Sequence, residues 1–342
     1  MTPSDLLAQR LHNQKLSAAD FRKPVELVRW FGAVQSQDFE AAKWALALRM
    51  RSATNAAIEE DFNRGTILRT HVMRPTWHFV AREDIRWLLD LTAARVDLRC
   101  GPGYRMFELD DAVFKRSHKI LERTLKDGNH LSRSELRRKL NKSGVEANDS
   151  VRMGHILIRA ELDRVICSGP RVGKQLTYAL FDERVPATKA MDCDEALAKL
   201  TQLYFRSHGP ATLQDFVWWS GLSTADAKRG LALVCLEKLT VGEKVYWSLR
   251  SSEAPMRSST TAHLLPVYDE YFVAYKDREC AFGPRDGKST WDSLGPAVIV
   301  NGVAAGTWNK KPLEVEFSRA LKKAERAAIA QATTRYAEFL AM

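Results

Sequence analysis

The sequence contains little glycine and proline and has no long apolar run. Of 342 residues, 18 are Gly and 12 are Pro, below the usual proportions of about 7% and about 5%. This composition excludes a collagen-like or linker-rich chain and favours a compact, helix-rich protein. The longest apolar run covers residues 231–236, whereas a membrane-spanning helix needs about 18 residues. Because the start also lacks a secretory signal pattern, we expect a soluble cytoplasmic protein of two or three folded units.

Metal ligands and common catalytic motifs are also missing. None of the five cysteines forms a CxxC pair, so zinc-ribbon and cysteine-ligated iron–sulfur sites have no ligand framework. We expect the cysteines to be buried free thiols. The sequence has no GxSxG, HExxH, P-loop or GxGxxG motif, and the Gly-Pro-Gly at residues 101–103 is predicted to be a turn. We therefore expect neither a metal nor another cofactor.

Positive charge is concentrated in one part of the chain. The formal net charge is +10, from 52 Lys and Arg against 42 Asp and Glu. Residues 115–175 hold 15 Lys or Arg and 7 Asp or Glu, so eight of the ten excess charges lie there. A basic segment attracts polyanions by releasing their counterions, which favours a nucleic-acid partner. From charge alone, a solvated basic face explains the segment equally well.

Capping patterns predict a repeated arrangement of helices and hairpins. A Ser or Thr followed three residues later by an acid predicts helix starts at Thr2, Ser132, Thr212 and Ser223. The last two boxes predict helices over 213–219 and 223–237, and residues 239–249 follow as a hairpin, which together make a winged helix. The same order recurs over residues 132–181, with a basic tip at 169–174. A third copy is predicted upstream, with helices at 3–15, 24–33 and 39–51 and a strand pair at 66–80.

The C-terminal part has a different pattern. Beyond residue 263, short β-rich runs separated by Gly and Pro predict a small barrel or sheet, and a closing helix follows. One face of that helix is apolar: Leu321, Ala324, Ala328, Ile329, Ala332, Tyr336, Phe339 and Leu340. The predicted fold is α+β, mainly α. Its predicted domains are a first winged-helix unit at 1–115, a second, basic one at 116–190, a third at 191–255, and a β-barrel-like unit with a terminal helix at 256–342.

Two segments contain candidate site residues. Residues 35–38, Gln-Ser-Gln-Asp, lie where the chain turns between apolar elements. A glutamine carbonyl can orient a water while its amide group donates elsewhere, although glutamine is not a general base at neutral pH. The alternative is a plain turn in which Asp38 caps the next helix.

In the second segment, strand alternation places Arg74, Thr76 and His78 on one face, and Pro75 implies an edge strand or a bulge. This face suits a phosphate or a base edge, and a structural histidine is the alternative. Trp218, Trp219 and Trp291 are predicted to be core residues and not base-stacking platforms.

Five segments in order over nearly the whole chain carry a family resemblance: GAVQSQDFEAAKWALALR, LRTHVMRPTWHFV, GPATLQDFVWWSGL, LLPVYDEYFVAYKDR and VNGVAAGTWNKK. In these segments the chain resembles the winged-helix DNA glycosylases of the AlkZ/AlkX type. The resemblance implies three tandem winged helices that form a C-shaped body around a DNA channel, with a C-terminal β-barrel. Pro75 departs from the family pattern, in which a glycine is expected.

The resemblance further implies the active site and the substrate. Gln35 and Gln37 would be the catalytic Gln-x-Gln pair, with Asp38 and His78 in support. The implied activity is monofunctional hydrolysis of the N-glycosidic bond of N7- or N3-alkylated purines in double-stranded DNA, including azinomycin-type interstrand crosslinks. We expect a monomer that associates with the nucleoid and not with a membrane. The expected DNA-binding residues are Arg74, Arg137, Arg138, Lys139, Arg171 and Lys174.

Two other functions stay open on the sequence. Winged helices are more common in regulators than in enzymes, so a DNA-binding regulator without enzymatic activity is one alternative. A scaffold that binds proteins through its basic or aromatic surface is the other. A sequence-specific binding site without base release would favour the regulator, and failure to bind a random duplex at moderate salt would favour the scaffold.

Overall fold

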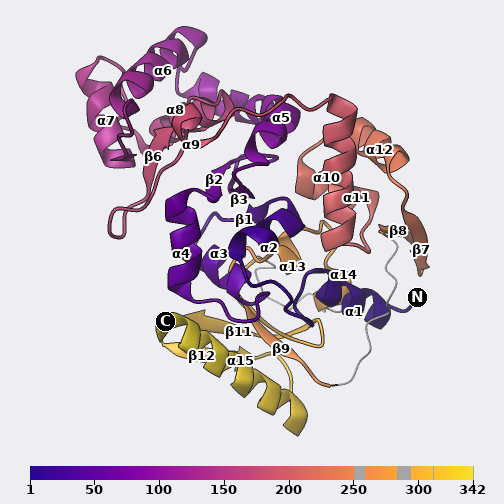
Figure 1. Ribbon diagram of the computed structural model, residues 1–342. Coiled ribbons are helices and arrows are strands. Elements are labelled where there is room, and N and C mark those ends of the chain that lie inside the picture. The colour runs from indigo at the N-terminus through magenta and orange to yellow at the C-terminus, as the bar shows by residue number, and fades with distance from the viewer. Residues whose placement is uncertain (250–258, 283–293, 311, 342) are drawn as a thin grey trace. The chain divides into compact units, whose positions relative to one another are not determined.

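The computed structural model describes residues 1–249, 259–282, 294–310 and 312–341 (Figure 1). The chain folds into two compact units, which we call the terminal unit (residues 1–59 and 197–342) and the central unit (residues 60–196). Both contain helices and strands, which confirms the predicted α+β class. Within the described ranges, no helix is both long enough and apolar enough to cross a membrane.

Long helices and short antiparallel strands build the central unit, which the chain enters along α4 (Asn55–Arg64). The first strands, β2 and β3, pair with Leu68 opposite Val80, as the predicted strand pair requires. Further along, three strands pair in the order β4-β6-β5. The elements are β2 (Ile67–His71), β3 (Trp77–Ala81), α5 (Ile85–Met106), α6 (Asp111–Leu125), β4 (Leu131–Ser132), α7 (Arg133–Lys142), α8 (Ser150–Leu162), β5 (Ile166–Ser168), β6 (Thr177–Leu180) and α9 (Phe181–Arg184).

The helix starts of the central unit follow their capping chemistry. The Ser132 side chain accepts from the amide of Glu135, and the Glu135 carboxylate accepts from the amide of Ser132, so the predicted capping box is confirmed. Asp149 caps α8, which begins close to the predicted start. The hairpin between β5 and β6 is also present, and a bridge between Val172 and Gln175 closes its tip.

The prediction of a turn at residues 101–103 is wrong, because Gly-Pro-Gly lies inside helix α5. Pro102 lacks an amide hydrogen, but the glycine before it has no Cβ to clash with the proline ring, so the helix can continue. Gly103 has a second role, since a Cβ there would lie only 2.2 Å from Nε2 of His155 on α8. The two helices therefore pack closely at this glycine.

The terminal unit is formed by both ends of the chain. Its N-terminal part contains α1 (Pro3–Asn13), α2 (Pro24–Phe31), β1 (Val34–Gln35) and α3 (Phe39–Ala47). The remaining elements are α10 (Cys193–Ser207), α11 (Leu213–Ser220), α12 (Thr224–Leu233), β7 (Glu237–Val241), β8 (Lys244–Ser248), β9 (Ala262–Leu265), α13 (Glu270–Val273), α14 (Glu279–Phe282), β10 (Ala297–Val300), β11 (Val303–Lys310), β12 (Leu313–Phe317) and α15 (Lys323–Ala341).

The predicted helix–turn–helix and hairpin are present in α11, α12, β7 and β8. Helix α11 ends at Gly221, whose φ of 70° is the left-handed conformation that glycine adopts without strain. Ser223 caps α12, which ends at Leu233 and not near residue 237 as predicted. Gly242, with φ of 58°, makes the turn of the hairpin. Ala211 bridges Trp247 as a further strand position beside β8.

The C-terminal strands pair as one antiparallel sheet in the order β12-β11-β10-β9. Because β9 and β12 lie at its two edges, the described strands form an open sheet, so of the two predicted forms the sheet is present and the barrel is not. Helix α15 packs against β9 and α3, so the closing helix is confirmed. Its buried face includes Ile329, Tyr336 and Phe339, whereas Leu340, predicted on that face, is 47% exposed.

Two other burial predictions need correction. Trp219 is fully buried as predicted, but Trp218 is 40% exposed and its indole N–H donates to the Val273 carbonyl. Trp291 lies outside the described residues. All five cysteines are free thiols, as predicted. However, two are exposed because they lie at the start of α10 and between α12 and β7: Cys100 and Cys167 are buried, Cys280 is half-buried, and Cys193 and Cys235 are exposed.

Candidate active site

The two glutamines lie in a turn between β1 and α3. Asp38 caps α3 by accepting from the amide of Ala41 at 2.9 Å. The Gln35 side chain folds back on the turn, and its Oε1 accepts from the amides of Ser36 at 3.0 Å and Gln37 at 3.1 Å. Gln35 and Ser36 are buried, whereas Gln37 is exposed. The side-chain carbonyl of Gln35 thus holds the turn in shape, and Gln37 is the glutamine that reaches solvent.

Two other places where a strand position precedes a helix cap differ from this turn. In the central unit, β4 ends at Ser132, which is itself the cap of the next helix. Ala211, which bridges β8, directly precedes the cap Thr212. Between the end of β1 and its cap, by contrast, Ser36 and Gln37 are inserted. The exposed Gln37 is one of these two residues.

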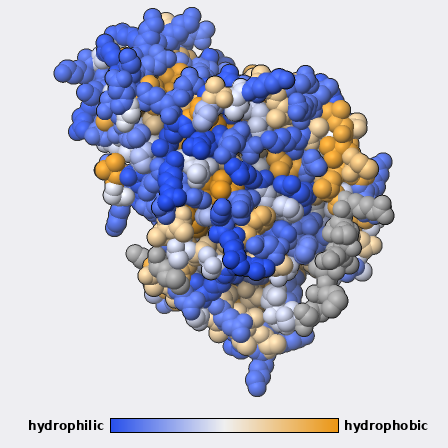
Figure 2. Space-filling view, in the orientation of Figure 1, coloured by the Kyte–Doolittle hydropathy of each residue, from blue (hydrophilic) through white to orange (hydrophobic). Residues whose placement is uncertain are grey.

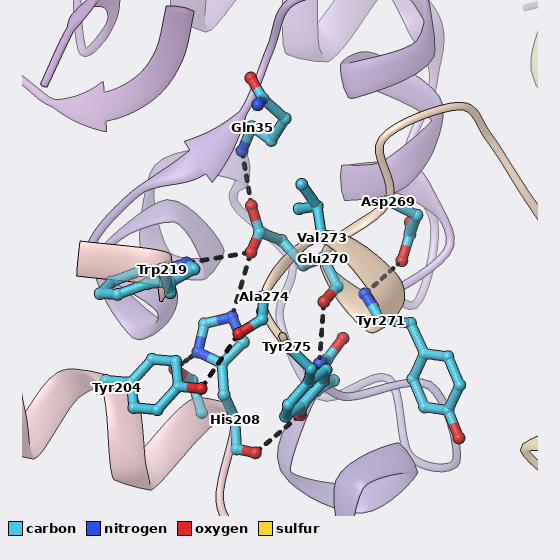
Figure 3. A network of polar contacts seen from close by, with 12 residues as sticks. Gln35, Tyr204, His208, Trp219, Asp269, Glu270, Tyr271, Val273, Ala274 and Tyr275 are labelled. Atoms are coloured by element: carbon cyan, nitrogen blue, oxygen red, sulfur yellow. Dashed lines mark hydrogen bonds and ion pairs between the residues drawn. The ribbon is translucent and has the colours of Figure 1, made fainter. Parts of the chain in front are cut away.

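A buried carboxylate fixes the turn from below. Glu270 is only 1% exposed, and its Oε1 accepts from the backbone N–H of Gln35 at 2.6 Å (Figure 3). Its Oε2 lies 3.2 Å from Nε2 of His208 and 3.2 Å from the indole nitrogen of Trp219. A buried carboxylate is costly unless donors surround it, and three donors converge here. Glu270 therefore ties the glutamine turn to the residue that follows α10 and to α11.

A second layer holds the segment that carries Glu270. Asp269 caps α13 and pairs with Arg49 through two contacts, at 2.9 Å and 2.6 Å. Arg49 also donates to Oε1 of Gln14, whose amide group contacts the Glu270 carbonyl and the Tyr275 hydroxyl. These residues are buried, so the position of Glu270 is fixed by paired and hydrogen-bonded groups.

His208 completes the buried network. Its ring stacks on Tyr204 with centroids 5.0 Å apart, and its Nδ1 lies 2.8 Å from the Ser207 hydroxyl. Burial lowers the pKa of His208, and the contact with Glu270 opposes that decrease. A neutral imidazole with its proton on Nε2 donates to Glu270 and leaves the negative charge on the carboxylate.

The predicted one-sided strand face of Arg74, Thr76 and His78 is wrong. Only His78 lies in a strand, because β2 ends at His71 and β3 begins at Trp77. Arg74 and Thr76 lie in the connection, where Met73 has a φ of 62° and Pro75 is exposed. His78 is fully buried, with Nδ1 2.9 Å from the Thr76 carbonyl oxygen. It belongs to the central unit, so its support of the glutamines stays a prediction.

The expected phosphate contacts are in the central unit. Arg138 and Lys139 on α7 are exposed and Arg137 is half-buried. Lys139 lines a surface hollow of about 550 Å³ together with Arg123 and Lys142. At the β5–β6 tip, Lys174 is exposed, and Arg171 is half-buried with its guanidinium donating to the Lys174 carbonyl. Figure 2 shows a mostly hydrophilic surface over α6 and α7.

Comparisons with known proteins agree with these features. A model of the AlkZ-like DNA glycosylase family matches residues 28–339. The chain belongs to the AlkZ-like DNA glycosylase family. One relative, the "Interstrand DNA cross-link repair glycosylase" of Streptomyces sahachiroi, is 23% identical over 327 residues, or 89% of this chain and 86% of the relative. The solved Streptomyces sahachiroi DNA glycosylase AlkZ matches with a TM-score of 0.78 and 22% identity, over 98% of this chain and 97% of that one.

Membership in the AlkZ-like family confirms the resemblance and makes the protein a DNA glycosylase, an enzyme that acts on the N-glycosyl bonds of DNA. Among the described residues, no group of three His, Cys, Asp or Glu side chains could hold a metal ion.

Sequence reasoning missed the buried network of this AlkZ-like protein. The segment LLPVYDEYFVAYKDR, which carries part of the family resemblance, also places Asp269 and Glu270 in an otherwise apolar run. Two adjacent carboxylates in such a run have to be paired when buried, so the signal was available. Their partners Arg49 and His208 lie 220 and 62 residues away and could not be identified from local patterns.

Proposed function

We propose that this AlkZ-like glycosylase is monofunctional and hydrolyses the N-glycosidic bond of N7- or N3-alkylated purines in double-stranded DNA. The observation that carries the site assignment is the turn at residues 35–38, in which one glutamine is buried as a brace and the other is exposed. By its Gln-x-Gln pattern the chain falls in the branch that unhooks azinomycin-type interstrand crosslinks. The Streptomyces sahachiroi relative is an interstrand DNA cross-link repair glycosylase by name, which supports crosslinked DNA as a substrate.

Gln37 is the residue that aligns the attacking water. Its side chain is exposed. The side-chain carbonyl of Gln35, by contrast, already accepts two backbone amide hydrogens and has little capacity left for a water. A carbonyl oxygen of Gln37 can accept from the water and hold it below C1′ of the sugar. Gln35 thus acts as a positioning residue, because it sets the backbone on which Gln37 sits.

The chemistry needs little more than this alignment. An alkyl group on N7 or N3 places a positive charge on the purine, so the base leaves readily without an acid. What remains is to position water and to stabilise the oxocarbenium-like transition state. The carboxylate of Glu270 is hydrogen-bonded to the backbone of Gln35 and adds a fixed negative charge beside the turn. A negative charge held in this place favours developing positive charge on the sugar.

The architecture that we propose consists of three winged-helix units, at 1–115, 116–190 and 191–255, followed by the C-terminal unit at 256–342. One order of elements, helix, short strand, helix, helix and hairpin, supports the repeat. It occurs in α2 to β3, in α6 to β6 and in α10 to β8, where Ala211 takes the place of the short strand. The tips and helices of such units place Arg74, Arg137, Arg138, Lys139, Arg171 and Lys174 against DNA phosphates.

The test is excision of N7-methylguanine from a duplex that carries one such base, followed by alkali to reveal abasic sites. Wild type is compared with Gln37→Ala and Gln35→Ala, and with Gln331→Ala as a matched exposed glutamine on α15. We expect Gln37→Ala to reduce excision at least a hundredfold, Gln35→Ala to reduce it by a smaller factor, and Gln331→Ala to leave it unchanged. Full activity of Gln37→Ala would refute the site assignment.

The same assay tests the activity itself. Because no lysine nucleophile is invoked, strands should remain intact until alkali is added. If wild type releases no base from this duplex or from a crosslinked one, yet binds one DNA sequence selectively, a non-enzymatic DNA-binding regulator becomes the better assignment.

A further inference from the structure

The central unit contains a cavity that the proposed chemistry does not use. Its volume is about 170 Å³, smaller than the ~300–1,000 Å³ typical of pockets for drug-sized ligands. Arg69, Trp77 and Arg133 at its border are half-buried, so the cavity reaches the protein surface. The lining comes from α4, both strands of the first hairpin, α7, α8, β5 and β6, and includes Phe62, Glu161, Ser168 and Tyr178.

Glu161 gives this cavity an unused hydrogen-bond acceptor. The residue is 1% exposed, and its Oε2 already receives three contacts: Nδ1 of His71 at 2.7 Å, the His71 amide at 2.9 Å and the Thr70 hydroxyl at 3.2 Å. Its Oε1 is buried and has no hydrogen-bond partner among the described residues. A buried carboxylate oxygen without a donor is costly, which points to a ligand that brings one.

The surroundings of Glu161 define that ligand. The cavity wall combines an acceptor with the aromatic side chains of Phe62 and Trp77 and with donors from Arg133 and Tyr178. Free phosphate fits poorly, because its oxygens would face the Glu161 carboxylate. A small planar molecule with an N–H donor on one edge and ring acceptors on another satisfies both kinds of wall.

We propose that this cavity is a nucleobase site, in which the exocyclic amino group of a purine donates to Oε1 of Glu161. The size of the cavity suits one base without its sugar and phosphate. Its lining residues belong to the central unit, whereas the glutamine turn belongs to the terminal unit. The site would take either a released base or an unpaired base that is still part of DNA. Base binding here does not require the proposed excision chemistry.

Calorimetric titration of the full-length protein with two modified bases tests the amino-group contact. In 9-methyladenine the amino group is the only N–H donor, and 9-methylpurine lacks it but has the same ring. A hydrogen bond to a charged acceptor predicts that wild type binds 9-methyladenine about tenfold or more tightly than 9-methylpurine. Equal affinities, or no binding of 9-methyladenine at about millimolar concentration, would overturn the proposal.

Two variants locate the site. In Glu161→Gln, the amide oxygen serves the three donors of Oε2, and the amide nitrogen then faces the cavity, so a donor replaces the acceptor. We expect the preference for 9-methyladenine to fall to about threefold or less. Leu176→Trp keeps Glu161 and fills the cavity from its lining, so both bases should lose binding. Unchanged binding in Leu176→Trp refutes the location even if Glu161→Gln fails to fold.

The source of the base is decided by competition. A duplex with a single bulged adenine is titrated with and without saturating 9-methyladenine, and a duplex with an abasic bulge is the control. Weaker binding of the adenine bulge alone in the presence of 9-methyladenine assigns the site to bases within DNA. Unchanged binding assigns it to free bases. Because these titrations use DNA without alkylation, their failure is distinguishable from failure of the excision assay.

Discussion

At the scale of single residues, the most consequential group is the carboxylate of Glu270, which is only 1% exposed. Glu270 binds the backbone of Gln35, and through Oε2 it fixes His208 and Trp219. The geometry of the exposed Gln37 therefore depends on the buried carboxylate of Glu270. If Gln37 aligns the water as proposed, polar packing beneath the turn supplies the precision of that alignment.

We predict that Glu270→Gln impairs both stability and excision. The amide offers one acceptor where the carboxylate served three donors, so at least one buried donor loses its partner. The free energy of unfolding should fall by about 1–3 kcal/mol, measured by urea denaturation. Excision of N7-methylguanine should fall at least tenfold at a temperature where the variant is folded, and Glu338→Gln on the exposed face of α15 is the matched control. Unaltered excision would show that the brace is dispensable.

A second residue-scale prediction concerns pH. Burial, with Arg335 and Arg49 nearby, lowers the pKa of His263 to about 3, whereas an unfolded histidine titrates near ~6.5. Between these values the unfolded chain binds the extra proton, so this residue lowers the free energy of unfolding as pH falls, by up to about 1.4 kcal/mol per pH unit well below the unfolded pKa. Urea denaturation at pH 7, 6 and 5 should show an average pH slope that is smaller by about 1 kcal/mol per pH unit in His263→Asn. The same slope in both proteins would contradict the prediction.

At the scale of elements, the contact between α5 and α8 makes two glycines behave in opposite ways. In Gly103→Ala the new Cβ would lie 2.2 Å from Nε2 of His155, and overpacking of this kind costs about 1–3 kcal/mol. In Gly154→Ala on α8, the nearest atom is the Arg133 guanidinium at 3.5 Å, an ordinary contact. The alanine there should stabilise the helix by up to about 1 kcal/mol. Thermal unfolding of both variants gives the sign, and destabilisation by both would refute the packing argument.

The β5–β6 tip carries the next prediction. If Arg171 and Lys174 contact phosphates, each contact releases counterions, and the slope of log affinity against log salt changes by about 0.9 per contact. Arg171→Ala/Lys174→Ala should therefore flatten the slope by about 1.8 for an undamaged duplex. Lys323→Ala/Arg326→Ala on α15 removes the same charge from another surface and should leave the slope unchanged. Equal slopes for the tip variant and wild type would remove the tip from the DNA contacts.

The elements were largely predictable from local chemistry, and their long-range partners were not. The capping boxes at Thr2, Ser132 and Thr212 are confirmed because they involve residues three apart. The turn predicted at residues 101–103 failed because packing of α5 on α8 overrides the local preferences of Gly and Pro. In the same way, the local pattern identified the glutamine turn but not Glu270, whose contact with it spans 235 residues.

At the scale of the whole molecule, the excess positive charge and the proposed catalytic turn lie in different parts of the chain. Eight of the ten excess positive charges lie in residues 115–175, within the central unit, whereas the glutamine turn and its buried network belong to the terminal unit. With the proposed phosphate contacts and the proposed site at the glutamine turn, the enzyme would gain sequence-independent affinity in one unit and carry out excision in the other. This division suits a cationic alkylated base, which a positively charged active site would repel.

The same division leads to a prediction about crosslinks. A base tied to the opposite strand cannot be extruded into a closed pocket, but an exposed turn can reach its glycosidic bond without extrusion. We expect wild type to convert a duplex crosslinked through two purine N7 atoms into separable strands, seen on a denaturing gel. One strand should then contain an abasic site, and cleavage there should require alkali. Gln37→Ala should leave the crosslink intact. Release of N7-methylguanine by an enzyme that fails on the crosslink would instead mean that the site requires an extruded base, which the exposure of Gln37 argues against.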